Sequence, residues 1–181
     1  LRRNSLDGVR VLVQGVGAVG RQLCRHLKAD GARLTVSDLR VDAANAAAAE
    51  FDAEAIAPEG VADADVDVFA PCALGAVLNR DTIPRLKAAA VAGSANNQLA
   101  DEGCGALLAA RGVLYAPDYV INAGGLINVH HEISGNYRRG RAFADVARIE
   151  ATLEEVFARA DRDGVPPHSA ADAMARERLA A

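Results

Sequence analysis

The chain has 181 residues, a formal net charge of −4 at pH 7 and 51% hydrophobic residues, which suits one domain with a sizeable core and no internal boundary. The net negative charge argues against a nucleic-acid-binding protein, which usually carries a basic surface. No apolar run is long enough for a membrane helix, and none forms a secretory signal. The three cysteines do not have the spacing of metal ligands. We therefore expect a cytoplasmic protein without nucleic-acid, membrane or metal partners.

The first element is an apolar strand, 9–14, that leads directly into three glycines at G-x-G-x-x-G spacing, Gly15, Gly17 and Gly20. This spacing is typical of a dinucleotide cradle. The first glycine lets the chain turn out of the strand, the second lets the backbone approach a pyrophosphate, and the third lets the next helix pack closely. The helix is expected to end at Gly31, and its N-terminus would hold the anion.

A second strand, 33–37, is followed by Asp38, at about the distance from the glycines where an acidic residue receives the ribose hydroxyls of NAD. A carboxylate at this point would repel the 2′-phosphate of NADP. Arg40 could attract that phosphate, so NADP remains an alternative. We predict NAD as the cofactor.

The rest of the chain alternates between strand and helix patterns. Strands are expected at 66–70, 90–92 and 113–116, a short edge strand at 53–57, and helices at 41–51, 82–86 and 105–110. From residue 126 the pattern is mainly helical, with a long helix over 139–160 and a final helix capped by Ser169. We predict an α/β fold: a doubly wound, mostly parallel sheet of the Rossmann type in three αβα layers, with C-terminal helices.

Small and polar residues follow several of these strands, where loops of a parallel sheet face the ligand crevice. Pro71 is expected to end regular pairing and begin such a loop. Asn96, Asn97 and Asn122 carry amides that can hold a carboxamide, a ribose hydroxyl or a carboxylate without adding charge. Asparagines after strands also serve turns, so each has a purely structural alternative.

Candidates for acid–base or nucleophilic chemistry are few, and we assign no catalytic residue. Cys72 has no base beside it in sequence, which favours a packing role. His130 lies on the apolar side of its helix, which favours a core position over proton transfer. The only lysines, Lys28 and Lys87, are expected far from the crevice.

The segments VQGVGAVG, APCALGAV, AGSANNQLA and YAPDYVINAGGLINV resemble the nucleotide-binding half of the glutamate/leucine/phenylalanine/valine dehydrogenases, most closely the leucine, valine and phenylalanine enzymes. The resemblance runs from Asp7 to about Arg178. It implies reversible oxidative deamination of an L-amino acid to a 2-oxo acid and ammonia with NAD. Motifs of the family's first, substrate-binding domain are missing, so we expect residues 1–181 to be the second domain of a longer homo-oligomeric protein.

The resemblance also implies roles for individual residues. Those on the pyrophosphate turn are Gly15, Gly17, Ala18, Val19 and Gly20, with Asp38 at the ribose. Those near the rest of the cofactor are Ala70, Cys72, Ala73, Ala95, Asn96 and Asn122. Those near the substrate are Asn122, Leu126 and Val129. An apolar wall at the last two positions favours a branched-chain or aromatic amino acid over a glutamate-like one, since a charged side chain would be left unpaired.

Two other functions are consistent with the glycine motif. The chain could be a stand-alone NAD(H)-binding or sensing module without catalysis, and the mass of the natural protein would distinguish this from a domain of a larger enzyme. It could also be a Rossmann dehydrogenase of the malic or folate type. Such an enzyme would keep the glycines but has no reason to carry the Asn-Ala-Gly-Gly segment at 122–125.

Overall fold

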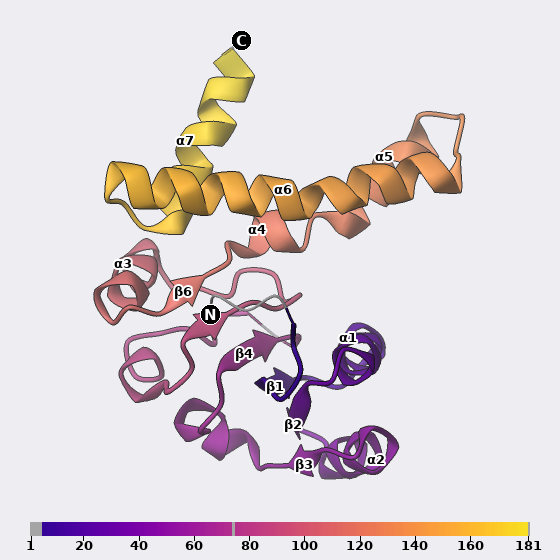
Figure 1. The fold of residues 1–181 in the computed structure, drawn as a ribbon, viewed down its shortest axis with the longest axis vertical. Helices are drawn as coiled ribbons and strands as arrows, with labels where there is room; N and C mark the ends of the chain where they lie inside the picture. Colours follow the sequence, from indigo (N-terminus) through magenta and orange to yellow (C-terminus); the bar gives the residue numbers. More distant parts are fainter. Residues whose placement is uncertain (1–4, 74, 181) are drawn as a thin grey trace. The chain divides into compact units, whose positions relative to one another are not determined.

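The computed structural model describes residues 5–73 and 75–180. Contacts gather in two compact units, Leu1–Tyr115 and Ala116–Ala181, a division that the sequence patterns do not reveal. The first unit contains the sheet and the second is helical (Figure 1).

The described residues of the first unit form six strands, all of them parallel. They are β1 (Arg10–Gln14), β2 (Arg33–Ser37), β3 (Glu54–Ala55), β4 (Val68–Pro71), β5 (Ala90–Val91) and β6 (Leu114–Tyr115). Their order, β3-β2-β1-β4-β5-β6, reverses direction between β1 and β4, which is where doubly wound sheets bind ligands. Gln14, at the end of β1, pairs with Ser37 on one side and Pro71 on the other, so three strands end together.

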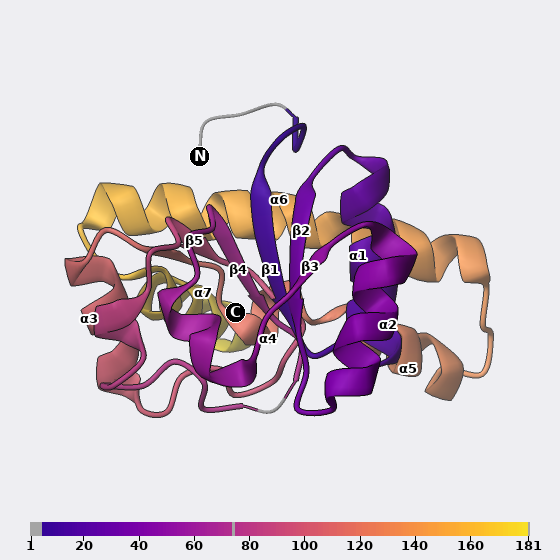
Figure 2. The same ribbon diagram turned by 90° about the horizontal axis from the view of Figure 1, so that it is seen from below.

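Helical segments cover both faces of this sheet (Figure 2). They are α1 (Ala18–Ala29), α2 (Val41–Phe51), η1 (Pro58–Asp63), η2 (Ile83–Arg85) and α3 (Glu102–Ala110). Side chains alternate along a strand, so Val11 and Val13 pack with α1 and α2 while Leu12 and, from β4, Phe69 pack with η1, η2 and α3. The predicted three-layer α/β fold is confirmed.

Some boundaries differ from the sequence patterns. Pro71 is the last residue of β4 rather than the first of a loop, because it still pairs with Gln14 of β1, whose carbonyl accepts from Cys72 N at 2.7 Å. Helix α3 begins three residues early because the Asp101 side chain accepts from Cys104 N and caps it. The last helix begins at Pro167 rather than after Ser169, since proline is favoured in a first helical turn.

The second unit consists of α4 (Asp118–Ile121), α5 (Gly124–Ile133), α6 (Arg139–Asp163) and α7 (Pro167–Ala180). Gly164, at φ +66°, ends α6 and lets α7 fold back against it. A small core of Val156, Ala160 and Met174 joins the two helices, and Arg159 donates to both carboxylate oxygens of Glu177. Within the described residues, every helix is too short or too polar to cross a membrane.

Candidate functional site

The three glycines after β1 occupy three different environments. Gly15 has φ +93°, and its N–H donates to Ser37 O at 2.7 Å, so the turn is fastened to the end of β2. A Cβ on Gly20 would lie 1.9 Å from Gly15 O, which shows that α1 packs directly on its own turn. A Cβ on Gly17 would meet nothing within 4 Å. The open space is therefore at the N-terminus of α1, where an anion is favoured.

Asp38 connects the end of β2 to this glycine turn. Its Oδ2 accepts from Val16 N at 2.9 Å and its Oδ1 from Arg40 N at 3.0 Å, while Arg40 Nε lies 3.7 Å from Oδ1. Burial to 14% exposure acts to raise the pKa of the carboxyl, but the two backbone hydrogen bonds and Arg40 outweigh it, and the net pKa is lowered. Asp38 is therefore an ionised acceptor beside the turn.

This lowered pKa predicts a pH-dependent effect of Asp38→Asn. A group whose pKa is lower in the folded state stabilises the fold above its ordinary pKa, about 4 for aspartate, and this contribution disappears as the pH falls through the folded-state value. We expect the difference in unfolding free energy between the original chain and the variant to be largest near pH 6 and to shrink toward pH 3. Urea unfolding at stepped pH measures it, and a difference independent of pH would contradict the ionised state.

A cavity of about 300 Å³ opens beside these groups, at the carboxyl ends of β1 and β2. Gly15, Asp38 and Ala73, all predicted cofactor residues, line it together with the apolar side chains of Leu39 and Val77. It is at the lower end of the roughly 300–1,000 Å³ typical of small-molecule pockets.

The other predicted cofactor residues of this unit lie around the same sheet edge with different exposure. Ala70 and Ala95 are buried, whereas Asn96 is exposed after β5. Ala18 and Val19, in the first turn of α1, are also exposed. Their predicted cofactor contacts stay predictions.

The cysteines fit structural roles. Cys72 is half-buried and its Cβ lies 3.5 Å from where a Cβ on Gly20 would be, so it packs beside the turn. Burial raises the pKa of the Cys24 thiol to about 11, which keeps it protonated at neutral pH.

Both lysines lie at the opposite edge of the sheet. Lys28 is in the last turn of α1, with its Nζ 3.1 Å from Asp52 Oδ2, and it borders a cavity with Arg33 at the start of β2. Lys87 precedes the start of β5. Neither reaches the glycine turn, as expected, and the described residues contain no group of side chains suited to a metal ion.

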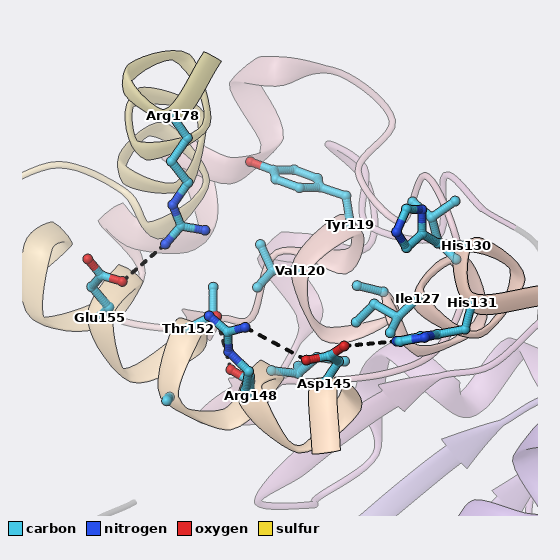
Figure 3. A pocket seen from close by; sticks show the side chains of 14 residues that line it. Tyr119, Val120, Ile127, His130, His131, Asp145, Arg148, Thr152, Glu155 and Arg178 are labelled. Atoms are coloured by element: carbon cyan, nitrogen blue, oxygen red, sulfur yellow. Dashed lines mark hydrogen bonds and ion pairs between the residues drawn. The ribbon is translucent and has the colours of Figure 1, made fainter. Parts of the chain in front are cut away.

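The second unit contains a separate cavity of about 910 Å³ between its own helices (Figure 3). Leu126, predicted at the substrate, lines it, whereas Val129 is exposed on α5 and Asn122 ends α4. His131 Nε2 lies 2.8 Å from Asp145 Oδ2, which ties α5 to α6.

The prediction that His130 occupies the core is wrong. His130 is exposed and His131 is the more buried histidine, because the expected apolar stripe of α5 is itself uncovered, with Ile133 81% exposed.

Comparison with known proteins gives consistent matches. A family model described as glutamate/leucine/phenylalanine/valine dehydrogenase matches residues 36–181. Leucine dehydrogenase from Thermoactinomyces intermedius is 52% identical over 97% of this chain and 48% of its own length, and valine dehydrogenase from Streptomyces albus is 46% identical over 93% and 47%. The crystal structure of L-tryptophan dehydrogenase from Nostoc punctiforme superimposes with a TM-score of 0.95 at 46% identity, over 98% of this chain and 54% of that one. The chain spans about half the length of these relatives.

Proposed function

The chain belongs to the glutamate/leucine/phenylalanine/valine dehydrogenase family, and from this premise we propose that it is the NAD-binding domain of an L-amino-acid dehydrogenase. The reaction is the reversible oxidative deamination of an amino acid to a 2-oxo acid and ammonia. Bound NAD would supply the hydride acceptor for the α-carbon. We place the groups that handle the substrate carboxylate and the protons in a further domain outside these residues, since the relatives are about twice as long.

The observation that carries this proposal is the contrast between two glycines. At Gly20 the backbone of the turn leaves no space for a Cβ, whereas at Gly17 the space is open in front of unpaired N–H groups of the helix start. A pyrophosphate fits this arrangement, because it needs both close backbone approach and the positive end of a helix dipole. In the proposed complex Asp38 accepts hydrogen bonds from the adenosine ribose, and Asn96 orients the nicotinamide end.

The direct test is a calorimetric titration of the 181-residue chain with NAD and with NADH. We expect saturable binding of both. Well-folded protein that gives neither heat nor saturable association with either form would overturn the proposal, including its alternative of a stand-alone NAD(H)-binding module. The mass of the natural protein then separates an enzyme domain from such a module.

Asp38 gives the proposal a prediction about cofactor choice. Asp38→Ser removes the charge that repels a 2′-phosphate and the acceptor for the ribose hydroxyls, so NAD is expected to lose about tenfold in affinity and NADP much less. Because Asp38 also holds Val16 N, part of the loss will be common to both cofactors, and the ratio of the two dissociation constants is the quantity to compare. Equal losses would contradict the assignment to the ribose.

We further propose that the amino acid has a branched-chain or aromatic side chain. Leu126 is 75% exposed and Val129 is exposed one turn later on α5, so this helix presents apolar side chains at the two predicted substrate positions. The relatives reported above, named for leucine, valine and tryptophan, are consistent with this. Initial rates of the full-length protein with leucine, valine, isoleucine, phenylalanine and glutamate would test it, and glutamate is expected to be the slowest.

A further inference from the structure

The helix that carries the two predicted substrate residues has little apolar packing of its own. Helix α5, which the structure describes in full, has no buried residue and no side-chain cap at its N-terminus, where Gly124 and Gly125 form the first turn. Gly135, at φ +72°, follows its other end. A ten-residue helix is marginally stable alone and glycines lower helix propensity, so the position of α5 depends on its contacts with neighbouring helices.

One face of α5 contacts α6. Successive residues of a helix point about 100° apart, so Gly124, Ile127 and His131 share this face. A Cβ on Gly124 would lie 3.7 Å from Val146 Cγ1, which shows how closely the N-terminal end of α5 approaches α6. Further along the same face, the side chain of His131 is only 17% exposed. This face is therefore the one that fixes α5 on its neighbour.

The opposite face of α5 is open. It carries Leu126, Val129 and Ile133, which are 75%, 45% and 81% exposed. Leu126 and Val129 are the two residues proposed to contact the side chain of the amino acid. The face that contacts α6 thus lies on the other side of the helix from the face proposed for the substrate.

His131 and Asp145 join α5 to α6 (Figure 3). His131 Nε2 lies 2.8 Å from Asp145 Oδ2, and because an ionised carboxylate only accepts hydrogen bonds, the ring nitrogen is the donor. Arg148 Nη1, one turn further along α6, lies 3.7 Å from Asp145 Oδ1. The carboxylate is therefore held between a ring from α5 and a guanidinium from its own helix.

We propose that the hydrogen bond between His131 and Asp145 positions α5 for substrate binding, which makes His131 a positioning residue for the side chain of the amino acid. The inference rests on the proposed function, because Leu126 and Val129 are the proposed substrate contacts. Without the hydrogen bond, α5 is free to tilt about its glycine-rich end. A displacement of about 1 Å in a positioned group is enough to weaken a substrate complex.

The test uses the full-length protein and its fastest amino-acid substrate. In His131→Leu we expect KM for the amino acid to rise about tenfold, the effect of one hydrogen bond to a charged group, while kcat and the dissociation constant of NAD change by less than about twofold. His131→Gln places an amide nitrogen near the position of Nε2 and should restore most of the affinity. A merely structural role would reduce the amount of folded enzyme, so kcat would fall with KM unchanged.

Asn128→Leu is the matched control on the same helix. Asn128 Nδ2 donates to Glu132 Oε1 at 2.7 Å, and Asn128 Oδ1 accepts from Tyr137 Oη at 3.0 Å, so these contacts stay within α5 and the segment that follows it. Their loss should lower the midpoint of thermal unfolding and leave KM unchanged. A rise of KM in this variant equal to that in His131→Leu would contradict a specific role for His131.

Asp145→Leu keeps the proposal testable if His131→Leu does not fold, since it removes the same hydrogen bond from the side of α6. It should raise KM to a similar extent, and the double variant should be no worse than either single variant. An unchanged KM, or a fall in kcat alone, would overturn the positioning role and leave the proposed dehydrogenase function intact. A full-length protein that forms no NADH with any amino acid would overturn the proposed function as well, so the two failures are distinguishable.

Discussion

Gly20→Ala is expected to lower the free energy of unfolding by about 3 kcal/mol, the upper part of the usual range for forcing extra atoms into a packed site. The added Cβ would lie 1.9 Å from Gly15 O, and the atom it meets is backbone rather than the end of a flexible side chain. Either α1 must move away from the sheet or the turn must open. Both changes disturb a turn held by Gly15 N and by Asp38, so dinucleotide binding should fall together with stability.

Gly17→Ala is the matched control for this prediction. Its Cβ would meet nothing within 4 Å and its φ of −70° is open to any residue, so the unfolding free energy should change by less than about 1 kcal/mol. The affinity for NAD should nevertheless fall at least about tenfold, since the methyl group occupies the space proposed for the pyrophosphate. Urea unfolding and calorimetry on both variants measure the two effects. A Gly20→Ala protein as stable as the original would contradict the close packing of helix and turn.

The glycine turn and Asp38 could be predicted because the relevant signals are local in sequence. Three glycines at fixed spacing after an apolar run specify the turn, and one acidic residue after the next strand specifies its neighbour. The same local signals predicted the alternation of strands and helices, and the motifs correctly indicated the family.

Two features of the molecule depend on packing that the sequence does not encode locally. Asn97 was one of three asparagines considered as ligand contacts, but its φ is +52° and its carbonyl accepts from Ala76 N at 2.6 Å, so it serves a turn. The histidines of α5 show a related difficulty. Successive residues point about 100° apart on a helix, and only the packing of α6 decides that His131, rather than His130, is covered.

The 181-residue chain is expected to have no dehydrogenase activity alone. With NAD and leucine it should form no NADH above background. The full-length protein should turn over at a rate on the order of 1–10³ per second, the usual range for enzymes. A deamination needs groups that exchange protons with the amino group and with water. The two lysines lie at the wrong edge of the sheet, and His131 is engaged with Asp145.

The measurement follows absorbance of NADH at saturating NAD, after calorimetry on the same sample has shown that the cofactor is bound. Binding without turnover would place the proton-transfer groups outside these residues. The hydride acceptor would then be present, and only the groups that transfer protons would be missing. Amino-acid-dependent NADH formation by the chain alone would contradict the proposal that the proton-transfer groups lie outside these residues. It would direct attention to His131 and Asp145, which are in contact within the second unit, with His131→Gln as the variant to examine next.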